Sequence, residues 1–267
     1  MRTRERFLLG LFRAVYVALF LLLVTPLLIV VITSFTEARY LTFPPEALTL
    51  QWYGEFLQDS SWIAAVFNSL IVGVGTMVIS TVLGVSAALG VRDRDSRLTN
   101  GLMLVSVLPL FIPPVIIGVA LLSLLSQYGL HQSYVGVIIA HTLWATPLVF
   151  FIMQAVFSRF NWNLRDAALD LGAGPYRTFF EIVLPEIREG LIAAGVIAFI
   201  VSLQEFIMAM FLTGVDTRTI PVLAYTAIRQ VLDPVVSVVS TVLVFSVLVL
   251  VIVAALLLGT ERLARQL

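Results

Sequence analysis

The sequence predicts an all-α membrane protein with six transmembrane helices and both termini in the cytoplasm. Three observations carry this prediction. The 267 residues are 60% hydrophobic and only 12% charged, with a mean hydropathy of +1.04, which is more apolar surface than a soluble domain can bury. Six apolar runs reach roughly the twenty residues that a helix needs to cross a bilayer. Arginines gather in the segments on one side of those runs.

The six runs form a single predicted transmembrane domain over 1–267. The first run follows the charged start MRTRERF and is predicted to be a retained anchor rather than a signal peptide, because it is too long and lacks a clear small-residue cleavage site. The fourth run contains His141, Thr142 and Pro147, which suit a helix packed inside a bundle. The predicted spans lie near 12–33, 63–90, 101–126, 134–157, 191–213 and 235–258.

The orientation is predicted from the arginines, which supply all sixteen basic residues. With the N-terminus inside, only Arg39, Arg218 and Arg229 fall on outer segments, and thirteen of the sixteen are cytoplasmic. Because cytoplasmic segments of membrane proteins are enriched in basic residues, both termini are placed in the cytoplasm. The cytoplasmic arginines are Arg2, Arg4, Arg6, Arg13, Arg92, Arg94, Arg97, Arg159, Arg165, Arg177, Arg188, Arg262 and Arg265.

Several kinds of site are not indicated by the sequence. The formal net charge of zero gives no sign of a nucleic-acid partner, and the chain has no cysteine. His131 and His141 have no second ligand at metal spacing, so no metal site is predicted, and an interior hydrogen-bonded imidazole is favoured for His141. No catalytic residues are predicted. The stretch GVGTMVISTVLG, residues 73–84, has small residues that permit close helix contact.

Two outer segments are long enough to have structure of their own. Residues 34–62 carry Phe, Tyr and Trp around a Pro-Pro pair and are predicted to lie at the membrane interface. Residues 214–234 contain a short amphipathic stretch.

The largest cytoplasmic segment is the loop 158–190, which contains DAALDLGAGPYRTFFEIVLP. Leu164, Ala167, Ala168 and Leu171 recur at the spacing of one helical face. Asn163 is predicted to cap this helix, near enough to Asp166 for the carboxylate to favour the helix dipole. The amphipathic pattern leaves two alternatives open: a helical hairpin packed on its own membrane helices, or a docking element for another protein.

The end of this helix and the next one are marked by glycine and proline. Gly172 or Gly174 can take the left-handed conformation that ends a helix, and Pro175 suits the first turn of the next helix. That helix is predicted to stop or kink at Pro185.

The loop resembles the cytoplasmic signature of ABC importer membrane subunits, Glu-Ala-Ala, three residues, Gly, nine residues, Ile-x-Leu-Pro. Every position is filled, with Asp in place of Glu at the first. LPLFIPPVIIGVALL and SLQEFIMAMFLTG look like the third and fifth spans of that family. TFPPEALTLQWY and TRTIPVLAYTAIRQVLDPVVSVVST look like its spermidine/putrescine permease branch. The matching residues are Asp166, Ala167, Ala168, Gly172, Ile182, Leu184 and Pro185.

The resemblance implies the type I importer permease fold in a bacterial inner membrane. It implies as partners a second permease subunit, in a heterodimer, two ATPase subunits and an extracytoplasmic substrate-binding protein. The segment that begins at Asp166 would be the coupling helix that seats in the ATPase. Leu171 and Gly174 would belong to the same contact. The chain has no G-x-x-x-x-G-K-[ST] sequence, so it is expected to bind no cofactor, and ATP and Mg²⁺ belong to the ATPase partners.

The resemblance also indicates the solute. A polyamine such as spermidine or putrescine is expected, and the alternative is another small solute, amino-acid-like, phosphonate or sugar. A self-contained secondary transporter is less favoured, because internal inverted repeats are not detected.

Glu205 is the only acidic residue well inside a predicted span, where an ionisable side chain usually faces a cavity or a partner. One interpretation is a carboxylate that lines the solute path, with Gln204 and Ser202 beside it. The other is a structural carboxylate tied to helix backbone at a kink, or to the partner subunit. Asn68, near the outer end of the second span, either lines the path or bonds across helices.

Overall fold

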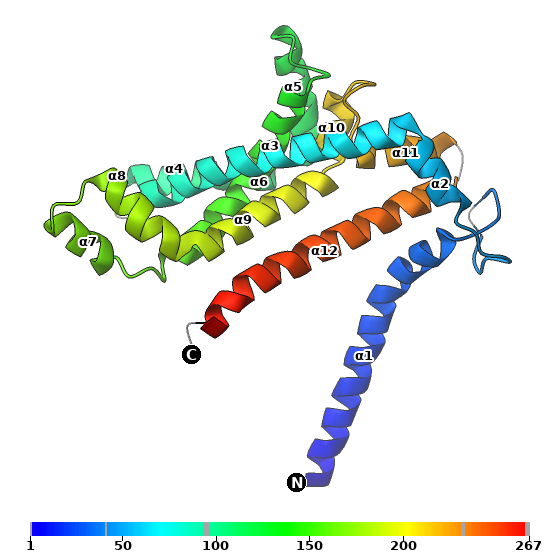
Figure 1. Ribbon diagram of the computed structural model, residues 1–267, viewed down its shortest axis with the longest axis horizontal. Helices are drawn as coiled ribbons and strands as arrows, with labels where there is room; N and C mark the ends of the chain where they lie inside the picture. The colour runs from blue at the N-terminus through cyan, green and yellow to red at the C-terminus, as the bar shows by residue number, and fades with distance from the viewer. Residues whose placement is uncertain (1, 41, 93–96, 231–232, 265–267) are drawn as a thin grey trace. The chain divides into compact units, whose positions relative to one another are not determined.

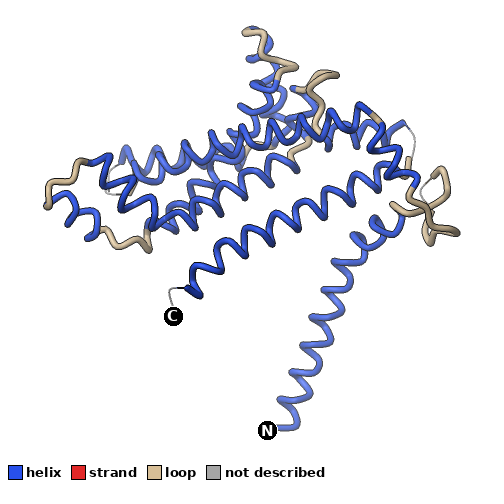
Figure 2. The backbone as a smooth tube through the Cα atoms, viewed as in Figure 1, coloured by secondary structure: helices blue, strands red, loops and turns tan. Residues whose placement is uncertain are grey.

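The computed structural model describes residues 2–40, 42–92, 97–230 and 233–264. The regular structure of these residues is helical, with no strand among them (Figure 2), which confirms the all-α prediction. Arg94 and Arg265, two of the arginines used to predict orientation, lie outside the described residues. The elements (Figure 1) are α1 (Arg2–Thr33), α2 (Gln51–Gln58), α3 (Ser60–Val91), α4 (Arg97–Val107), the 3₁₀ helix η1 (Leu108–Phe111), α5 (Pro114–Gln127), α6 (Tyr134–Phe157), α7 (Asn163–Asp170), α8 (Pro175–Thr178), the π-helical turn η2 (Phe179–Val183), α9 (Leu184–Gln204), α10 (Ile207–Leu212), α11 (Ile220–Gln230) and α12 (Val235–Ala264).

Four of the described helices are long and apolar enough to cross a membrane, and one bent pair of helices could form a fifth span. The four agree with the spans that the sequence predicts near 12–33, 63–90, 134–157 and 235–258. They are Leu8–Thr33, Ser60–Val91, Tyr134–Phe157 and Val235–Leu256.

The predicted span 101–126 is not one continuous helix. Met103–Phe111 and Pro114–Gln127 are bent by 104° relative to each other. Between them Ile112 and Pro113 have ψ of 128° and 132°, an extended conformation. Because a proline disfavours the α conformation in the residue before it, the pair Pro113-Pro114 ends one helix and starts the next.

The predicted span 191–213 is also interrupted. α9 ends at Gln204, Glu205 has an extended backbone with φ of −70° and ψ of 117°, and α10 begins at Ile207. Neither α9 nor α10 is among the four helices above. The interruption contains neither proline nor glycine, so its cause lies in side-chain contacts.

The chain divides into two compact units, Met1–Ile63 with Ala224–Ser246, and Ala64–Leu223 with Val247–Leu267. In the first unit the segment 34–50 folds onto α2. Trp52 Nε1 donates a hydrogen bond to the backbone oxygen of Thr36 at 2.6 Å. The Tyr53 hydroxyl lies 2.8 Å from Ser34 Oγ, and its ring contacts Phe35. The short amphipathic stretch predicted in 214–234 is the helix α11, Ile220–Gln230.

In the second unit α6 packs along α9 (Figure 1), and small residues let neighbouring helices approach closely. A Cβ added at Gly84 of α3 would lie 2.6 Å from Val149 Cγ1 of α6. A Cβ added at Gly73 of α3 would likewise lie 2.7 Å from the Phe199 ring of α9. The prediction that residues 73–84 permit close helix contact is therefore confirmed.

Two buried apolar clusters stabilise the second unit. One gathers Phe150, Met153 and Ile187 where α6 meets α9. The other gathers Met208 and Leu212 of α10 with residues of α3, α5 and α6. The first cluster continues toward the loop between α6 and α9, and the second surrounds the interruption at Glu205, so the two candidate sites described below each rest on a packed core.

Candidate functional site

The first candidate site is the loop between α6 and α9. α7 begins at Asn163, and the side-chain oxygen of Asn161 accepts a hydrogen bond from the Asn163 backbone N–H at 3.2 Å. The Asn163 side chain makes no cap hydrogen bond, so the prediction that it caps the helix is wrong. Asp166 lies in the first turn, as the sequence predicts, where a carboxylate favours the helix dipole.

α7 ends in a Schellman motif. Gly172 has φ of +87°, its N–H donates to the oxygen of Leu169 at 2.9 Å, and the Ala173 N–H donates to Ala168 at 3.0 Å. Of the two glycines considered for this role, Gly172 has the left-handed conformation, whereas Gly174 has φ of −70°. Pro175 opens α8, which confirms its predicted position.

The apolar face of α7 and the turn after it is largely exposed. Leu171 has 89% of its surface exposed, Tyr176 83% and Phe180 61%. Leu164, at the start of the apolar stripe, is 48% exposed. Apolar side chains gathered on an exposed surface mark an interaction site more often than a solvated one. Among the described residues, therefore, the protein's own helices leave Leu164, Ala167 and Leu171 of this face exposed, and only Ala168 is partly buried.

The segment after α8 continues as helix through Pro185. The Leu184 N–H donates to Phe179 O across the π-helical turn η2, and Pro185 then lies at the start of α9. A proline has no N–H to donate, and its ring clashes with the preceding turn of an α-helix. The wider turn of the π-helix accommodates the ring. The sequence predicts that the helix stops or kinks at Pro185, and in the structure it does not stop there. Ile182 and Leu184 are partly buried.

Trp162 joins the loop to the rest of the second unit. Its Nε1 donates to the oxygen of Phe157 at 3.0 Å, and its ring contacts those of Phe157 and Phe160. The Arg92 guanidinium, just after α3, lies over the ring with Cζ 3.1 Å from the centroid. The sequence does not predict a contact between these two residues, since a tryptophan just before a helix carries no signal of what it will contact.

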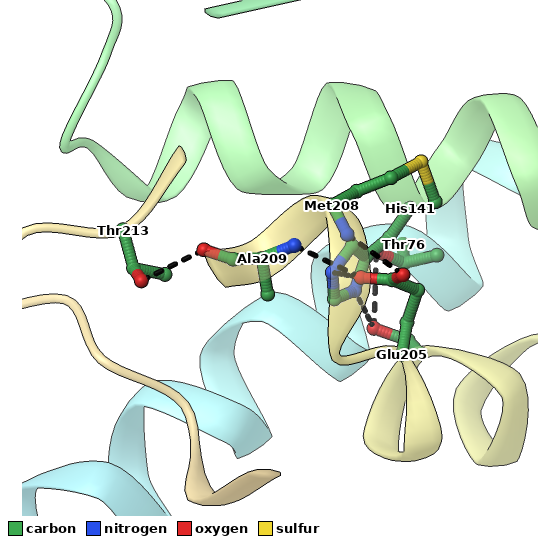
Figure 3. A network of polar contacts seen from close by, with 7 residues as sticks. Thr76, His141, Glu205, Met208, Ala209 and Thr213 are labelled. Carbon is green, nitrogen blue, oxygen red and sulfur yellow. Dashed lines mark hydrogen bonds and ion pairs between the residues drawn. The ribbon is translucent and has the colours of Figure 1, made fainter. Parts of the chain in front are cut away.

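The second candidate site is the interruption between α9 and α10 (Figure 3). Glu205 Oε1 accepts a hydrogen bond from the Met208 N–H at 2.9 Å, and Oε2 accepts one from the Ala209 N–H at 3.0 Å. The carboxylate therefore caps the first turn of α10, where a negative charge also complements the helix dipole.

His141 of α6 faces this carboxylate. Its Nε2 lies 3.2 Å from Glu205 Oε2, at ion-pair distance although not aligned as a hydrogen bond. Its Nδ1 is 2.7 Å from Ser202 Oγ, which is 3.4 Å from Thr76 Oγ1 of α3. The prediction of a bonded interior imidazole at His141 is confirmed. The sequence spacing could not predict its pairing with Glu205, because the two residues are 64 positions apart.

Asn68 lies apart from this network. Its Nδ2 donates to the backbone oxygens of Asp216 and Arg218, both at 2.9 Å, and its Oδ1 accepts from the Tyr134 hydroxyl at 2.7 Å. The side chain thus holds the turn after α10 against α3 and α6. This geometry supports the second of the alternatives for Asn68, bonding across elements.

Among the four residues predicted for the solute path, Ser202 and Glu205 are brought together and Asn68 is bonded elsewhere. Gln204 is exposed at the end of α9. Within the described part of the chain, no three His, Cys, Asp or Glu residues lie close enough to hold a metal ion.

The segment that contains both sites matches a protein-family model. Residues 80–261 match the family described as "Binding-protein-dependent transport system inner membrane component". The chain belongs to this family. Both the loop with its Gly172 and the interruption at Glu205 lie inside the matched residues, so both are parts of a binding-protein-dependent transport component.

Curated members of related transport systems are similar along most of the chain. The putrescine transport system permease protein PotI of Escherichia coli strain K12 is 29% identical, over 85% of this chain and 83% of that protein. The spermidine/putrescine transport system permease protein PotC of the same strain is 25% identical, over 93% and 92%. This chain is therefore a transport permease of the ABC importer type. The prediction that it is a transport subunit and not an enzyme is confirmed by these relatives, whose names describe transport permeases.

A solved structure shares the fold of this inner membrane component. It is the crystal structure of a bacterial alginate ABC transporter in complex with an alginate pentasaccharide-bound periplasmic protein. The match has a TM-score of 0.72 and 17% identity, and it covers 94% of this chain and 93% of that one. At this identity the likeness bears on the fold alone, and it confirms the predicted type I importer permease fold.

Proposed function

We propose that this protein is the membrane-spanning subunit of an ATP-driven importer that moves a polyamine, spermidine or putrescine, into the cytoplasm. The observation that carries the proposal is the family match over residues 80–261, together with the two relatives whose names specify putrescine and spermidine. Another small solute, amino-acid-like, phosphonate or sugar, is the alternative, and the alginate transporter of the same fold keeps a sugar in consideration.

In this proposal six segments cross the bacterial inner membrane and both termini lie in the cytoplasm. The bent pair formed by Met103–Phe111 and Pro114–Gln127 makes the third span, and α9 with α10 makes the fifth. A helix can be interrupted at membrane depth when the freed backbone groups are satisfied within the protein, as the Glu205 carboxylate does for the start of α10. The bias of arginine toward one side supports the orientation.

The partners follow from the importer architecture. A second permease subunit completes a heterodimer, two ATPase subunits bind at the cytoplasmic face, and an extracytoplasmic protein delivers the solute. ATP and Mg²⁺ are bound by the ATPase subunits, and this chain binds no cofactor, because its sequence has no phosphate-binding loop.

The loop between α6 and α9 is proposed to dock into the ATPase. Leu171 and Tyr176 present the apolar surface that such a contact would bury, and burial of apolar area is the main driving force of stable association. Gly172 sets the direction of the turn. The full set of proposed coupling residues is Asp166, Ala167, Ala168, Leu171, Gly172, Gly174, Ile182, Leu184 and Pro185.

The solute path is proposed to run past the interruption between α9 and α10. Gln204 is the exposed polar side chain at this level of α9. Ser202 and Glu205 are less exposed than Gln204. Asn68 holds the turn after α10 by its hydrogen bonds. A polar side chain placed against a path of apolar helices is typical of residues that a passing solute contacts.

Reconstitution in liposomes tests the proposal. The complete complex, with its ATPases and a polyamine-loaded binding protein, is expected to take up labelled putrescine or spermidine when ATP is supplied. This chain alone is expected to take up none. Uptake without an ATPase subunit would reject the importer function. ATP-dependent uptake of a sugar or amino acid, with none of either polyamine, would reject the polyamine and leave the importer.

A further inference from the structure

The Glu205 carboxylate is engaged by its own chain, and we infer that it is a positioning residue that fixes α10 rather than a ligand of the transported solute. Its two oxygens accept the N–H groups of Met208 and Ala209 at 2.9 and 3.0 Å. His141 lies against Oε2 at 3.2 Å. Thr76, His141, Ser202 and Glu205 are called the latch here; Figure 3 labels Thr76, His141 and Glu205 of this set.

α10 depends on this carboxylate because it is short. It has six residues, Ile207–Leu212, and a helix of that length is not stable by itself. The first N–H groups of any helix have no partner within it, and a buried, unpaired N–H is costly where water is excluded. Glu205 satisfies two of these groups at once. The position of α10 is therefore set by the cap and by packing.

The latch connects four elements of the second unit. Thr76 belongs to α3, His141 to α6 and Ser202 to α9, while Glu205 lies between α9 and α10, two residues before Ile207. The side chain of His141 is fully buried and that of Glu205 is 8% exposed. Removing one partner of a buried polar pair leaves the other without compensation. Loss of His141 should therefore displace Glu205 and, through it, α10.

A displaced α10 would disturb α5, because the two helices are packed without spare room. A Cβ added at Gly118 of α5 would lie 2.8 Å from the Phe211 ring and 3.3 Å from Met208 Cα. Met208 and Leu212 are fully buried in the same cluster. Closely packed interiors transmit small shifts instead of absorbing them. The latch thus sets the contact between α5 and α10.

A solute-binding role for Glu205 makes the opposite prediction for His141. If the carboxylate bound a cationic solute, His141 would compete with that solute for Oε2. Replacing His141 by a neutral side chain would then leave uptake intact or raise it. In a latch, His141 and Glu205 act together, and the two replacements give the same defect.

The test compares Glu205→Gln, His141→Gln and the double variant in the purified complex. Thermal unfolding is measured together with uptake and ATP hydrolysis. Glu55→Gln makes the same chemical change on the exposed face of α2 and serves as the control. Ser202→Ala is a milder variant, because it removes only the hydroxyl that contacts His141 Nδ1. It keeps the test decisive if a stronger variant does not assemble.

Each single variant is expected to lower the unfolding midpoint by about 2–6 °C, the shift typical of losing a buried hydrogen bond in a domain of this size. The double variant should fall by less than the sum of the singles. Uptake per ATP hydrolysed should drop to a similar extent in both singles, and Ser202→Ala should show a smaller drop of the same kind.

Two results would overturn the latch: normal stability and uptake in His141→Gln beside lost uptake in Glu205→Gln, or additive shifts in the double variant. Only the uptake measurement rests on the proposed function. Polyamine uptake missing from the unsubstituted complex, with the unfolding shifts as expected, would reject the proposed solute and leave the latch standing.

Discussion

The loop between α6 and α9 and the interruption between α9 and α10 use side chains in opposite ways. In the loop, large apolar side chains are exposed, with Leu171 at 89% and Tyr176 at 83%. At the interruption, polar side chains are buried and bonded, with Glu205 held by two backbone N–H groups and by His141. Both patterns run against the usual distribution of residues.

The difference indicates which region needs another molecule. A buried polar group that is fully bonded is complete within its own chain, and the interruption is therefore a structural element of the permease. An apolar surface left exposed gains free energy only when something covers it. The loop is the region built for a partner. Substitutions in the loop should weaken assembly and leave the fold intact, whereas substitutions at the interruption should weaken the fold.

The largest effect is expected from Leu171→Asp. A carboxylate placed in an apolar contact loses the burial of leucine and must be desolvated, together about 3 kcal/mol or more, which corresponds to a roughly hundredfold weaker association. Binding of the purified ATPase to the permease pair in nanodiscs measures it. The unfolding midpoint of the permease pair itself should stay unchanged.

Leu50→Asp is the matched control for this substitution, because Leu50 is also exposed but precedes α2, far along the chain from the loop. It should leave ATPase binding unaltered. Equal ATPase binding by Leu171→Asp and the unsubstituted protein would break the comparison, because the loop would then be no docking surface.

A smaller effect is expected from Gly172→Val. At φ of +87° a residue with a Cβ costs about 1–2 kcal/mol, and a β-branched one more. Because nothing lies within 4 Å of an added Cβ, the cost is backbone strain and not a clash. Coupled uptake and ATPase association should fall roughly tenfold.

Gly174→Val provides the control, with the same residue change two positions away. Gly174 has φ of −70° and ψ of 157°, which valine adopts readily, and its surroundings are also open. Because Gly174 is itself a proposed coupling residue, Gly174→Val adds bulk at the docking surface without backbone strain, and it should lower coupled uptake less than Gly172→Val does. Equal defects in the two variants would show that bulk on the docking surface matters, and that the turn conformation does not.

The sequence was informative where structure depends on local properties. Four spans agree with their apolar runs, because a hydrocarbon core selects for length and hydropathy alone. The left-handed position was limited to Gly172 or Gly174 and proved to be Gly172, and Pro175 was placed correctly, because positive φ and a fixed φ each favour one residue type. The bend at Pro113 and Pro114 could also have been predicted from the sequence, because a Pro-Pro pair inside the run 101–126 interrupts a helix.

The remaining features depend on contacts between distant residues. The chain at Glu205 has no helix-breaking residue, and it leaves the helix because a carboxylate there reaches the N–H groups of α10 and an imidazole from α6. The Asn163 cap failed because Asn163 is already the first residue of α7, preceded by Trp162 as the cap residue, and the Asp166 N–H donates to the oxygen of Trp162 at 3.1 Å. A sequence pattern indicates which side chain is able to cap a helix, and tertiary packing decides which one does so.

The smallest effect is expected at Trp162, where the loop meets the body of the second unit. The Arg92 guanidinium stacks on the Trp162 ring, and a lysine there would keep the charge while losing the planar stack. Such a contact contributes about 0.5–1 kcal/mol at a partly exposed site, so Arg92→Lys should lower uptake per ATP hydrolysed by only about two- to fivefold. ATPase binding should be unchanged, because the exposed apolar face of α7 is untouched. Arg159→Lys makes the same replacement at an exposed arginine nearby in the loop and should show neither change. If Arg92→Lys weakened ATPase binding as strongly as Leu171→Asp does, this residue would belong to the docking surface, and the boundary drawn here between the partner-facing loop and the self-contained body would have to move.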